Sequence, residues 1–165
     1  MPVDGIRLAG PDDASLLAGL LRAAFAQQAD ELGLRADQYP RHPAFRTAEA
    51  VVEEMREGFI FFILEADREP VGCVAIRTDA PHGGDGYLGR LAVVPAARGR
   101  GYGRLLMAFA EVALCDRGAR TVRIGVLREL TGLQEYYRRL GYTSVQVEQC
   151  EGTGLPAVFM DKPLR

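Results

Sequence analysis

The sequence has few of the residues that form disulfides or hold metals. Among its 165 residues are two histidines and three cysteines. Because Cys73, Cys115 and Cys150 are odd in number and widely spaced, they predict reduced thiols of a cytoplasmic protein and not a disulfide framework or metal cluster. His42 and His82 have no partner at ligand spacing, so we expect no metal site.

Two further features are missing: a long apolar run and a strong net charge. Hydrophobic residues make up 48% of the chain, but no run is long enough to span a bilayer, and no charged-then-apolar leader is present. We therefore expect a soluble, cytoplasmic protein without a membrane partner. The formal net charge of −2 leaves no general basic surface for nucleic acid. The length suits one domain over residues 1–165.

The most informative segment is a turn rich in glycine and arginine. It follows a strand-like run, Tyr87 to Val94, and opens a helix-like run, Leu105 to Cys115. Its residues are Arg98, Gly99, Arg100, Gly101, Tyr102, Gly103 and Arg104. The first N–H groups of a helix have no partner within it, and the helix dipole favours negative charge there. Since glycines let an anion approach the backbone closely, this turn predicts a phosphate site.

Three kinds of glycine-rich loop can hold a phosphate. A P-loop ends in Gly-Lys-Ser/Thr, which this chain lacks. A Rossmann turn needs G-x-G-x-x-G and an acidic residue about twenty positions on, whereas these glycines are spaced G-x-G-x-G and the next strand, Thr121 to Leu127, does not end in Asp or Glu. The third pattern, R-x-x-G-x-G at Arg98, Gly101 and Gly103, resembles the pyrophosphate loop of the GNAT acetyltransferases, which hold acetyl-coenzyme A (acetyl-CoA).

The resemblance to the GNAT family covers roughly residues 85 to 165. Leu91-Ala92-Val93 looks like the end of the family's fourth strand, Tyr137 to Tyr142 like its Y-x-x-x-G-F/Y segment, and Val158 to Leu164 like its closing strand. Two motifs about 35 residues apart, in the family's order, form a specific signal. The implied fold class is α/β (α+β): a single-domain GNAT-like fold with a mixed central sheet of about seven strands flanked by about four helices.

Hydrophobic periodicity and turn residues give the expected elements. Helices are expected from residue 11 onward, over 47–57, over 103–117 and over 131–140, the last with a capping box between Thr131 and Gln134. Strands are expected over 3–9, 59–65, 71–77, 87–94, 121–127, 142–149 and 155–161. The second and third should form a hairpin, and those at 87–94 and 121–127 should be parallel because a helix connects them. Residues 27–46 read as irregular.

The resemblance also implies where the cosubstrate binds. In GNAT proteins the fourth and fifth strands splay apart, and the pantetheine arm of acetyl-CoA lies between them. This arm is therefore expected along Leu91, Ala92 and Val93, and the pyrophosphate on the N–H groups of residues 98–104. A backbone N–H near Val93 would polarise the thioester carbonyl. Many relatives carry an asparagine where this chain has Leu130.

Tyr137 occupies the position at which the family often has a catalytic tyrosine. A neutral phenol can stabilise or protonate the departing thiolate, whose thiol has a pKa of about 8.5. Tyr136 lies about 100° further round the helix and is expected to face elsewhere. The general base stays open, with Asp85, Glu65, Glu148 or a water chain as candidates.

Together these features predict an N-acetyltransferase that moves an acetyl group from acetyl-CoA to a primary amine by direct attack in a ternary complex. We expect a small-molecule amine as the acceptor, bordered by residues 27–46, with their carboxylates at 30, 31 and 37, and by the loop at 151–154. Two alternatives stay open: a peptide or protein N-terminal acetyltransferase, and a non-catalytic acyl-CoA-binding sensor or scaffold. A homodimer stays open as well.

Overall fold

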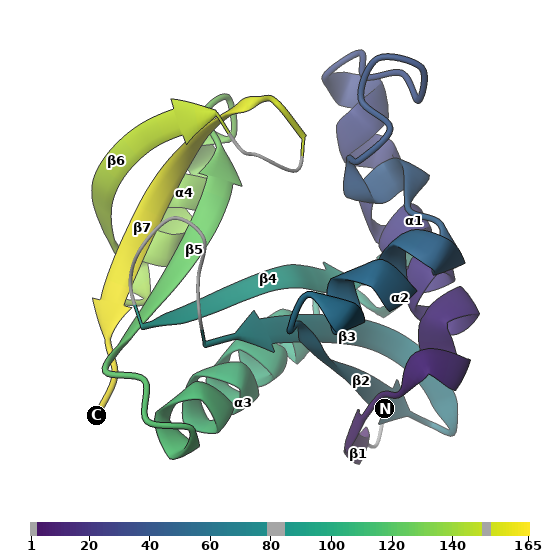
Figure 1. Ribbon diagram of the computed structural model, residues 1–165, viewed down its shortest axis with the longest axis horizontal. Helices are drawn as coiled ribbons and strands as arrows, with labels where there is room; N and C mark the ends of the chain where they lie inside the picture. Colours follow the sequence, from purple (N-terminus) through teal and green to yellow (C-terminus); the bar gives the residue numbers. More distant parts are fainter. Residues whose placement is uncertain (1–2, 79–84, 150–152) are drawn as a thin grey trace.

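The computed structural model describes residues 3–78, 85–149 and 153–165, and its elements surround one seven-stranded sheet (Figure 1). The strands are β1 (Val3–Leu8), β2 (Ile60–Ala66), β3 (Glu69–Arg77), β4 (Gly86–Val93), β5 (Thr121–Leu127), β6 (Thr143–Gln149) and β7 (Pro156–Pro163). The α-helices are α1 (Ala14–Glu31), α2 (Ala48–Arg56), α3 (Tyr102–Asp116) and α4 (Thr131–Arg139). The predicted α/β class, with a mixed sheet of seven strands and four helices, is confirmed.

The sheet has the order β1-β2-β3-β4-β5-β7-β6. Its neighbouring strands are antiparallel except β4 and β5, which are parallel as predicted. These two strands pair only at their beginnings, where Gly86 lies opposite Val122 and Tyr87 opposite Arg123. Further along they diverge, and Figure 1 shows β5, β6 and β7 leaning away from the rest of the sheet. The splay expected from the family is therefore present.

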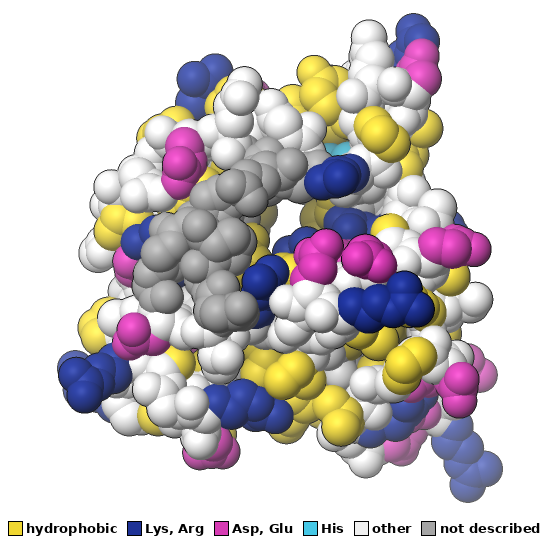
Figure 2. Space-filling model, in the orientation of Figure 1, with side chains coloured by type: hydrophobic (Ala, Val, Ile, Leu, Met, Phe, Trp, Pro, Cys, Tyr) yellow, Lys and Arg dark blue, Asp and Glu magenta, His cyan; other side chains and the backbone are white. Residues whose placement is uncertain are grey.

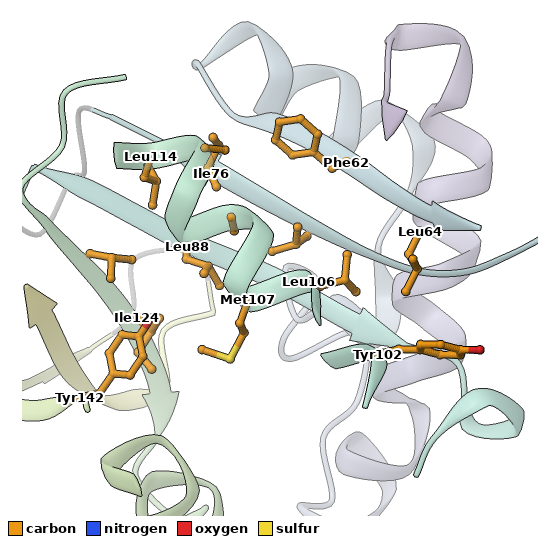
Figure 3. Packing of buried hydrophobic residues seen from close by; sticks show 14 of the residues in the cluster. Phe62, Leu64, Ile76, Leu88, Tyr102, Leu106, Met107, Leu114, Ile124 and Tyr142 are labelled. Atoms are coloured by element: carbon orange, nitrogen blue, oxygen red, sulfur yellow. The ribbon is translucent and has the colours of Figure 1, made fainter. Parts of the chain in front are cut away.

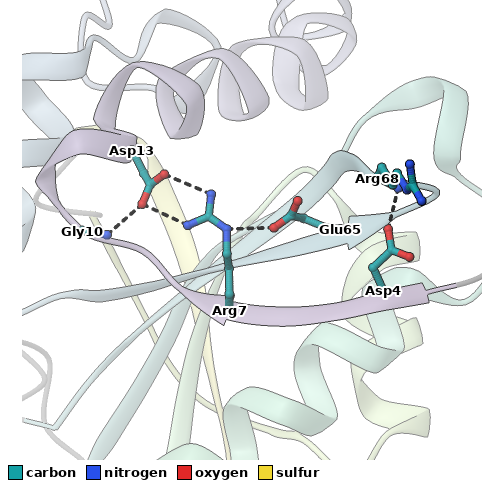
Figure 4. Close-up of polar contacts among 6 residues, drawn as sticks. All are labelled: Asp4, Arg7, Gly10, Asp13, Glu65 and Arg68. Atoms are coloured by element: carbon teal, nitrogen blue, oxygen red, sulfur yellow. Dashed lines mark hydrogen bonds and ion pairs between the residues drawn. The ribbon is translucent and has the colours of Figure 1, made fainter.

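The β2–β3 hairpin carries the start of the chain beside it. Its two-residue turn consists of Asp67 and Arg68, both with left-handed φ, of 54° and 64°, as tight hairpins with a type I′ turn require. Arg7 of β1 binds Glu65 of β2 over 2.8 Å and Asp13 over 3.0 Å (Figure 4). Since Asp13 directly precedes α1, these contacts place the first turn of that helix against β1 and β2.

Both faces of the sheet are buried, and β2 shows why. Its side chains alternate, so that Phe62 and Leu64 join the cluster around α3, whereas Phe61 and Ile63 join the cluster around α1 and α2. Figure 3 shows the first cluster, in which residues of the sheet pack against Leu106 and other side chains of α3. Within the described segments, no helix combines the length and apolar content needed to cross a membrane.

Two local predictions were wrong. Residues 27–46 are not irregular throughout, because α1 continues to Glu31, where Gln27 donates a side-chain hydrogen bond to Glu31 over 2.9 Å. The expected capping box at Thr131 is also absent: α4 begins there, but its N-cap is Leu130, without a side-chain cap. The buried Gln134 amide instead donates to the carbonyl oxygens of Leu127 and Arg128, which satisfies the backbone of the preceding turn.

Candidate active site

The divergence of β4 and β5 opens a cleft of about 840 Å³. Its lining comes from β4, β5 and α4, and also from α1, α2 and the segment before α2. Figure 2 shows this face of the molecule hollowed at its centre, with basic and acidic side chains around the opening. Six residues predicted for the site line the cleft: Leu91, Ala92, Val93, Arg98, Gly103 and Tyr137.

The cleft exposes one edge of β4. On its other edge the strand pairs with β3, where Val93 lies opposite Gly72. Past Tyr87, no strand among the described residues pairs with the edge that faces β5. An extended ligand can therefore hydrogen-bond to Leu91–Val93 as an added strand would.

A β-bulge interrupts this strand. The register with β3 shifts between Gly89 and Ala92, which leaves Arg90 and Leu91 opposite a single residue. Arg90 has a left-handed φ of 51°. Bulges of this kind bend a strand and redirect the residues that follow, here those of the cleft edge.

The glycine turn leads into the N-terminus of α3. Gly99 and Gly101 have left-handed φ values of 78° and 82°, and the hydrogen bond from Leu105 N to Gly101 O is the helix's first. The N–H groups of residues 102–104 precede that bond and so have no acceptor within the helix. A Cβ added at Gly99, Gly101 or Gly103 would meet no protein atom within 4 Å. The space beside these N–H groups is open, which fits a bound pyrophosphate.

The other predicted residues of this turn differ in their surroundings. The Arg98 guanidinium donates to two backbone carbonyls, that of Val93 over 3.3 Å and that of Ala24 over 2.5 Å, and so ties β4 to α1. Arg100 is exposed. Tyr102 has its ring in the core, 4% exposed, which leaves only its backbone for a ligand.

Arg104 lies outside the main cleft. It lines a smaller hollow of about 280 Å³ together with Tyr136, Arg139 and Leu140. Tyr136 therefore faces away from the cleft, as predicted.

Tyr137 lines the cleft from α4, and Leu130, the N-cap of that helix, lines it too. The Tyr137 ring is half-buried and lies 5.6 Å from that of Tyr136 and 6.0 Å from that of Tyr142, between centroids. Burial, with a smaller contribution from Tyr136, raises the pKa of Tyr137 to about 12. Its hydroxyl is therefore protonated at neutral pH and can donate a hydrogen bond.

None of the three carboxylates named as candidate bases lines the cleft. Asp85 accepts a hydrogen bond from the backbone N–H of Arg120, Glu65 pairs with Arg7, and Glu148 is exposed on the edge strand β6. Among the described residues, the carboxylates that line the cleft are Glu31, Glu53, Glu54 and Glu57. Of these, only Glu54 is buried.

Sequence reasoning missed a network of charged residues around Glu54. Its carboxylate binds the guanidinium groups of Arg46 and, over 2.5 Å, Arg90. The Arg90 guanidinium also lies 4.1 Å from the centroid of the Phe59 ring. One signal was available: Glu54 follows Val51 by three positions and so shares the buried face of α2. A carboxylate at such a position requires a partner.

His42 is also part of the lining, although only 1% of it is exposed. Its Nδ1 accepts a hydrogen bond from the N–H of Ala44, so Nε2 carries the proton and donates to Gln28. Burial, and next the charge of Arg46, lower the pKa of His42 to about 4. Within the described part of the chain, no group of three or more His, Cys, Asp or Glu side chains is arranged to hold a metal ion.

The cysteine and loop predictions have mixed outcomes. Cys73 is fully buried in the sheet, and burial raises the pKa of its thiol to about 12, as expected for a small core residue. Cys150, His82 and residues 151–152 of the loop at 151–154 lie outside the described residues. Thr153, from the end of that loop, does line the cleft.

Comparison with known sequences identifies relatives along most of the chain. The family model described as "Acetyltransferase (GNAT) family" matches residues 16–142. A mycothiol acetyltransferase of Rhodococcus erythropolis is 32% identical over 152 residues, which cover 88% of this chain and 48% of that protein. An uncharacterised N-acetyltransferase of Chlorobaculum tepidum is 29% identical over 103 residues, covering 62% of this chain and 60% of that protein. The chain thus spans less than two thirds of the length of either relative.

Solved structures share the fold over nearly the full chain. The PaiA N-acetyltransferase of Thermoplasma acidophilum, solved with coenzyme A, has a TM-score of 0.74 and 19% identity, and the match covers 99% of both chains. The ribosomal-protein-S18-alanine N-acetyltransferase of Escherichia coli has a TM-score of 0.72 and 16% identity, with 97% of this chain and 93% of that chain covered.

Proposed function

This chain belongs to the GNAT acetyltransferase family, and we propose that it transfers the acetyl group of acetyl-CoA to a primary amine of a small molecule. One observation carries the proposal: a single cleft is lined by the bulged edge of β4 at Leu91–Val93, by Gly103 at the start of α3 and by Tyr137 of α4. These are the three elements that such a transfer needs, namely a site for the acyl arm, a site for the phosphates and a hydrogen-bond donor for the leaving group.

The acyl donor is expected to bind along two backbone features. The edge of β4 offers peptide groups to the amides of the pantetheine arm. The N–H groups that precede Leu105 in α3, with the open space beside Gly101 and Gly103, suit the pyrophosphate. The coenzyme A complex of the PaiA protein, which shares this fold, is consistent with such a ligand.

The proposed reaction balances without a further reactant. The amine nitrogen bonds to the thioester carbonyl carbon, the C–S bond breaks, and the proton lost by nitrogen compensates for the one that sulfur gains. A backbone N–H near Val93 would stabilise the negative charge that develops on the carbonyl oxygen. Because the pKa of Tyr137, about 12, exceeds that of a free thiol, about 8.5, its hydroxyl stabilises the thiolate chiefly as a hydrogen-bond donor.

The acceptor is expected on the side of the cleft formed by α1 and α2. Glu31, Glu53 and Glu57 are exposed there among the lining residues, and carboxylates attract an ammonium group before it loses its proton. The relative from Rhodococcus erythropolis is named for mycothiol and not for a protein. This favours a small acceptor over a protein N-terminus.

The test is a thiol-release assay with acetyl-CoA against a panel of polyamines, amino acids, amino-bearing antibiotics and peptides with free N-termini. We expect a small amine to be turned over and its acetylated product to be found by mass spectrometry. A peptide that is acetylated faster than every small amine would overturn the choice of acceptor. Tight acetyl-CoA binding by calorimetry without turnover of any amine would identify a non-catalytic acyl-CoA sensor instead.

A further inference from the structure

Arg90 has an unusual backbone conformation for its place in the fold. Three non-glycine residues of the described chain have a left-handed φ: Asp67, Arg68 and Arg90. The first two form the hairpin turn, where this conformation is required. Arg90 lies within a strand. A left-handed φ there brings its Cβ close to the backbone and costs free energy, which surrounding contacts must offset.

The side chain of Arg90 is held on two sides. Its Nε donates to Glu54 over 2.5 Å, and its guanidinium stacks on Phe59. The two partners of the ion pair are shielded from water, with 20% of the Arg90 side chain and 8% of the Glu54 side chain exposed. Ion pairs in such surroundings are screened little and strongly restrict the geometry of both partners.

Glu54 is itself fixed by contacts outside β4. Its second oxygen accepts from Arg46. Arg46 also donates to the carbonyl of Arg41 over 3.1 Å, and its own carbonyl accepts from Arg22 of α1 over 2.6 Å. The carboxylate is thus anchored to α1, α2 and the segment between them, so it can resist movement of Arg90.

The bulge determines which way the cleft edge of β4 faces. The N–H of Val94 donates to Val71 of β3 over 2.9 Å, and peptide groups alternate between the two edges of a strand, so the N–H of Val93 faces the cleft. Loss of the extra residue would shift this part of β4 by one position and turn the Val93 N–H towards β3. Gly72 of β3 accommodates the present arrangement, because a Cβ there would lie 2.6 Å from the carbonyl oxygen of Ala92.

From these contacts we propose that Glu54 and Arg90 are positioning residues: their ion pair holds the β4 bulge in place and thereby aims the backbone of Leu91–Val93 at the acyl thioester. The inference rests on the proposed acetyltransferase function and adds to it a link between the acceptor side of the cleft and the donor strand. Neither side chain needs to touch the reacting atoms.

Two substitutions at residue 90 separate this role from direct binding. Arg90→Ala removes the ion pair but keeps a Cβ, so the left-handed bulge becomes unfavourable. Arg90→Gly removes the same ion pair and also the steric conflict. We expect kcat to fall by about tenfold or more in Arg90→Ala and by less than about threefold in Arg90→Gly, with the KM for the amine changed by less than about twofold in both. Glu54→Gln should lower kcat in the parent protein, and its further effect on kcat in Arg90→Gly should be smaller, since only the contact to Arg46 remains to be weakened there.

Arg68 supplies a matched control. It is also an arginine with a left-handed φ, but it lies in the hairpin turn and lines no part of the cleft. Arg68→Ala and Arg68→Gly should differ in stability and leave kcat unchanged. Equal losses in Arg90→Ala and Arg90→Gly, together with a raised KM for the amine, would show that Arg90 binds the acceptor and would overturn the proposal. Full activity in Arg90→Ala would overturn it as well.

A readout without turnover keeps this test separate from that of the proposed function. The N–H of Val94 donates to the carbonyl of Val71 in β3 over 2.9 Å, so its amide hydrogen exchange should be about tenfold faster in Arg90→Ala and close to the parent rate in Arg90→Gly. If no amine is acetylated but this difference in exchange is found, the ion pair does hold the bulge, and it is the proposed function that fails. If an amine is acetylated but the rate of amide hydrogen exchange is the same in all variants, the proposed role of the Glu54–Arg90 ion pair is wrong and the proposed function stands.

Discussion

His42 Nε2 donates a hydrogen bond to Oε1 of Gln28 over 2.9 Å and joins the segment before α2 to helix α1. On the other side of the ring, Nδ1 accepts from the N–H of Ala44 over 3.1 Å. Both bonds need the neutral imidazole, since a protonated ring has no acceptor for Ala44. The wall of the cleft therefore depends on the protonation state of a buried histidine.

We expect the stability of the protein to fall as the pH drops from about 6.5 to about 4. The pKa of His42 is lowered from 6.5 to about 4 in the folded state. A lowered pKa means that the unfolded chain binds the proton first, so the contribution is complete above pH 6.5 and is lost towards pH 4. The loss should reach on the order of 3 kcal/mol. Urea denaturation between pH 4 and 7.5 should show a shallower dependence for His42→Asn, and equal slopes for both proteins would contradict this assignment.

A side chain at Gly103 should block the acyl donor without harming the fold. Gly103 lies in the first turn of α3, where an added Cβ meets no protein atom within 4 Å. In Gly103→Glu the new carboxylate would occupy the cleft and repel the pyrophosphate, so we expect affinity for acetyl-CoA to fall by more than about tenfold in calorimetry. Thermal stability should be kept or slightly raised, since glycine is a poor helix former.

The control for this substitution is Gly132→Glu. Gly132 occupies the first turn of α4, also has open space beside it, and does not line the cleft. Unchanged binding by Gly132→Glu and lost binding by Gly103→Glu would support the proposed phosphate site. If Gly103→Glu binds acetyl-CoA as tightly as the parent protein, the donor lies elsewhere.

Arg98 and Arg100 should act differently despite sharing the glycine turn. Arg98 donates to the carbonyls of Val93 and Ala24, so Arg98→Ala should lower the free energy of unfolding by about 1–3 kcal/mol. Arg100 is exposed, so Arg100→Ala should change stability by less than about 0.5 kcal/mol. It should weaken acetyl-CoA binding a few-fold at low salt and less at high salt. An Arg98→Ala protein that is fully stable but no longer binds acetyl-CoA would make Arg98 a phosphate ligand.

The fold was predictable where local patterns carried it. The hairpin turn before Pro70, the glycine that ends α3 and the continuous run of large apolar residues in β2 each specify one element without distant information. The parallel pairing of β4 and β5 followed from the helix between them. The end of α1 was missed because the polar residues after Phe25 weaken the apolar period, although glutamine and glutamate are good helix formers.

The proposed donor side of the candidate site could be inferred from local patterns as well, since it lies in two short motifs, and it stays a prediction. The acceptor side could not, because Arg46, Glu54 and Arg90 come from three separate elements and meet only in the fold. The bulge was hidden as well: a left-handed residue in a strand suggests glycine, and the chain has arginine there. The contacts of Arg90 come from Glu54 and Phe59, which are distant in the sequence, so no local pattern predicts them.

The last prediction concerns Tyr137. Replacing it with phenylalanine keeps the ring and removes the hydroxyl, so kcat should fall by a factor on the order of 10²–10⁴ if the phenol stabilises the departing thiolate. Affinity for acetyl-CoA, measured by calorimetry, should change little. Tyr136→Phe is the matched control, because its ring lies on the same helix but faces the smaller hollow. It should keep the parent rate.

The pH dependence sharpens this test. The pKa of Tyr137 is raised from 10 to about 12, so the neutral phenol persists through pH 10 and its loss cannot cause a fall in rate below that pH. We expect kcat of the parent protein to hold from about pH 8 to 10, and the ratio of parent to Tyr137→Phe rates to stay constant over the same range. A ratio that declines near pH 9 would mean that the hydroxyl ionises too early for this role. Equal rates for both proteins in the chemical step would assign Tyr137 to packing.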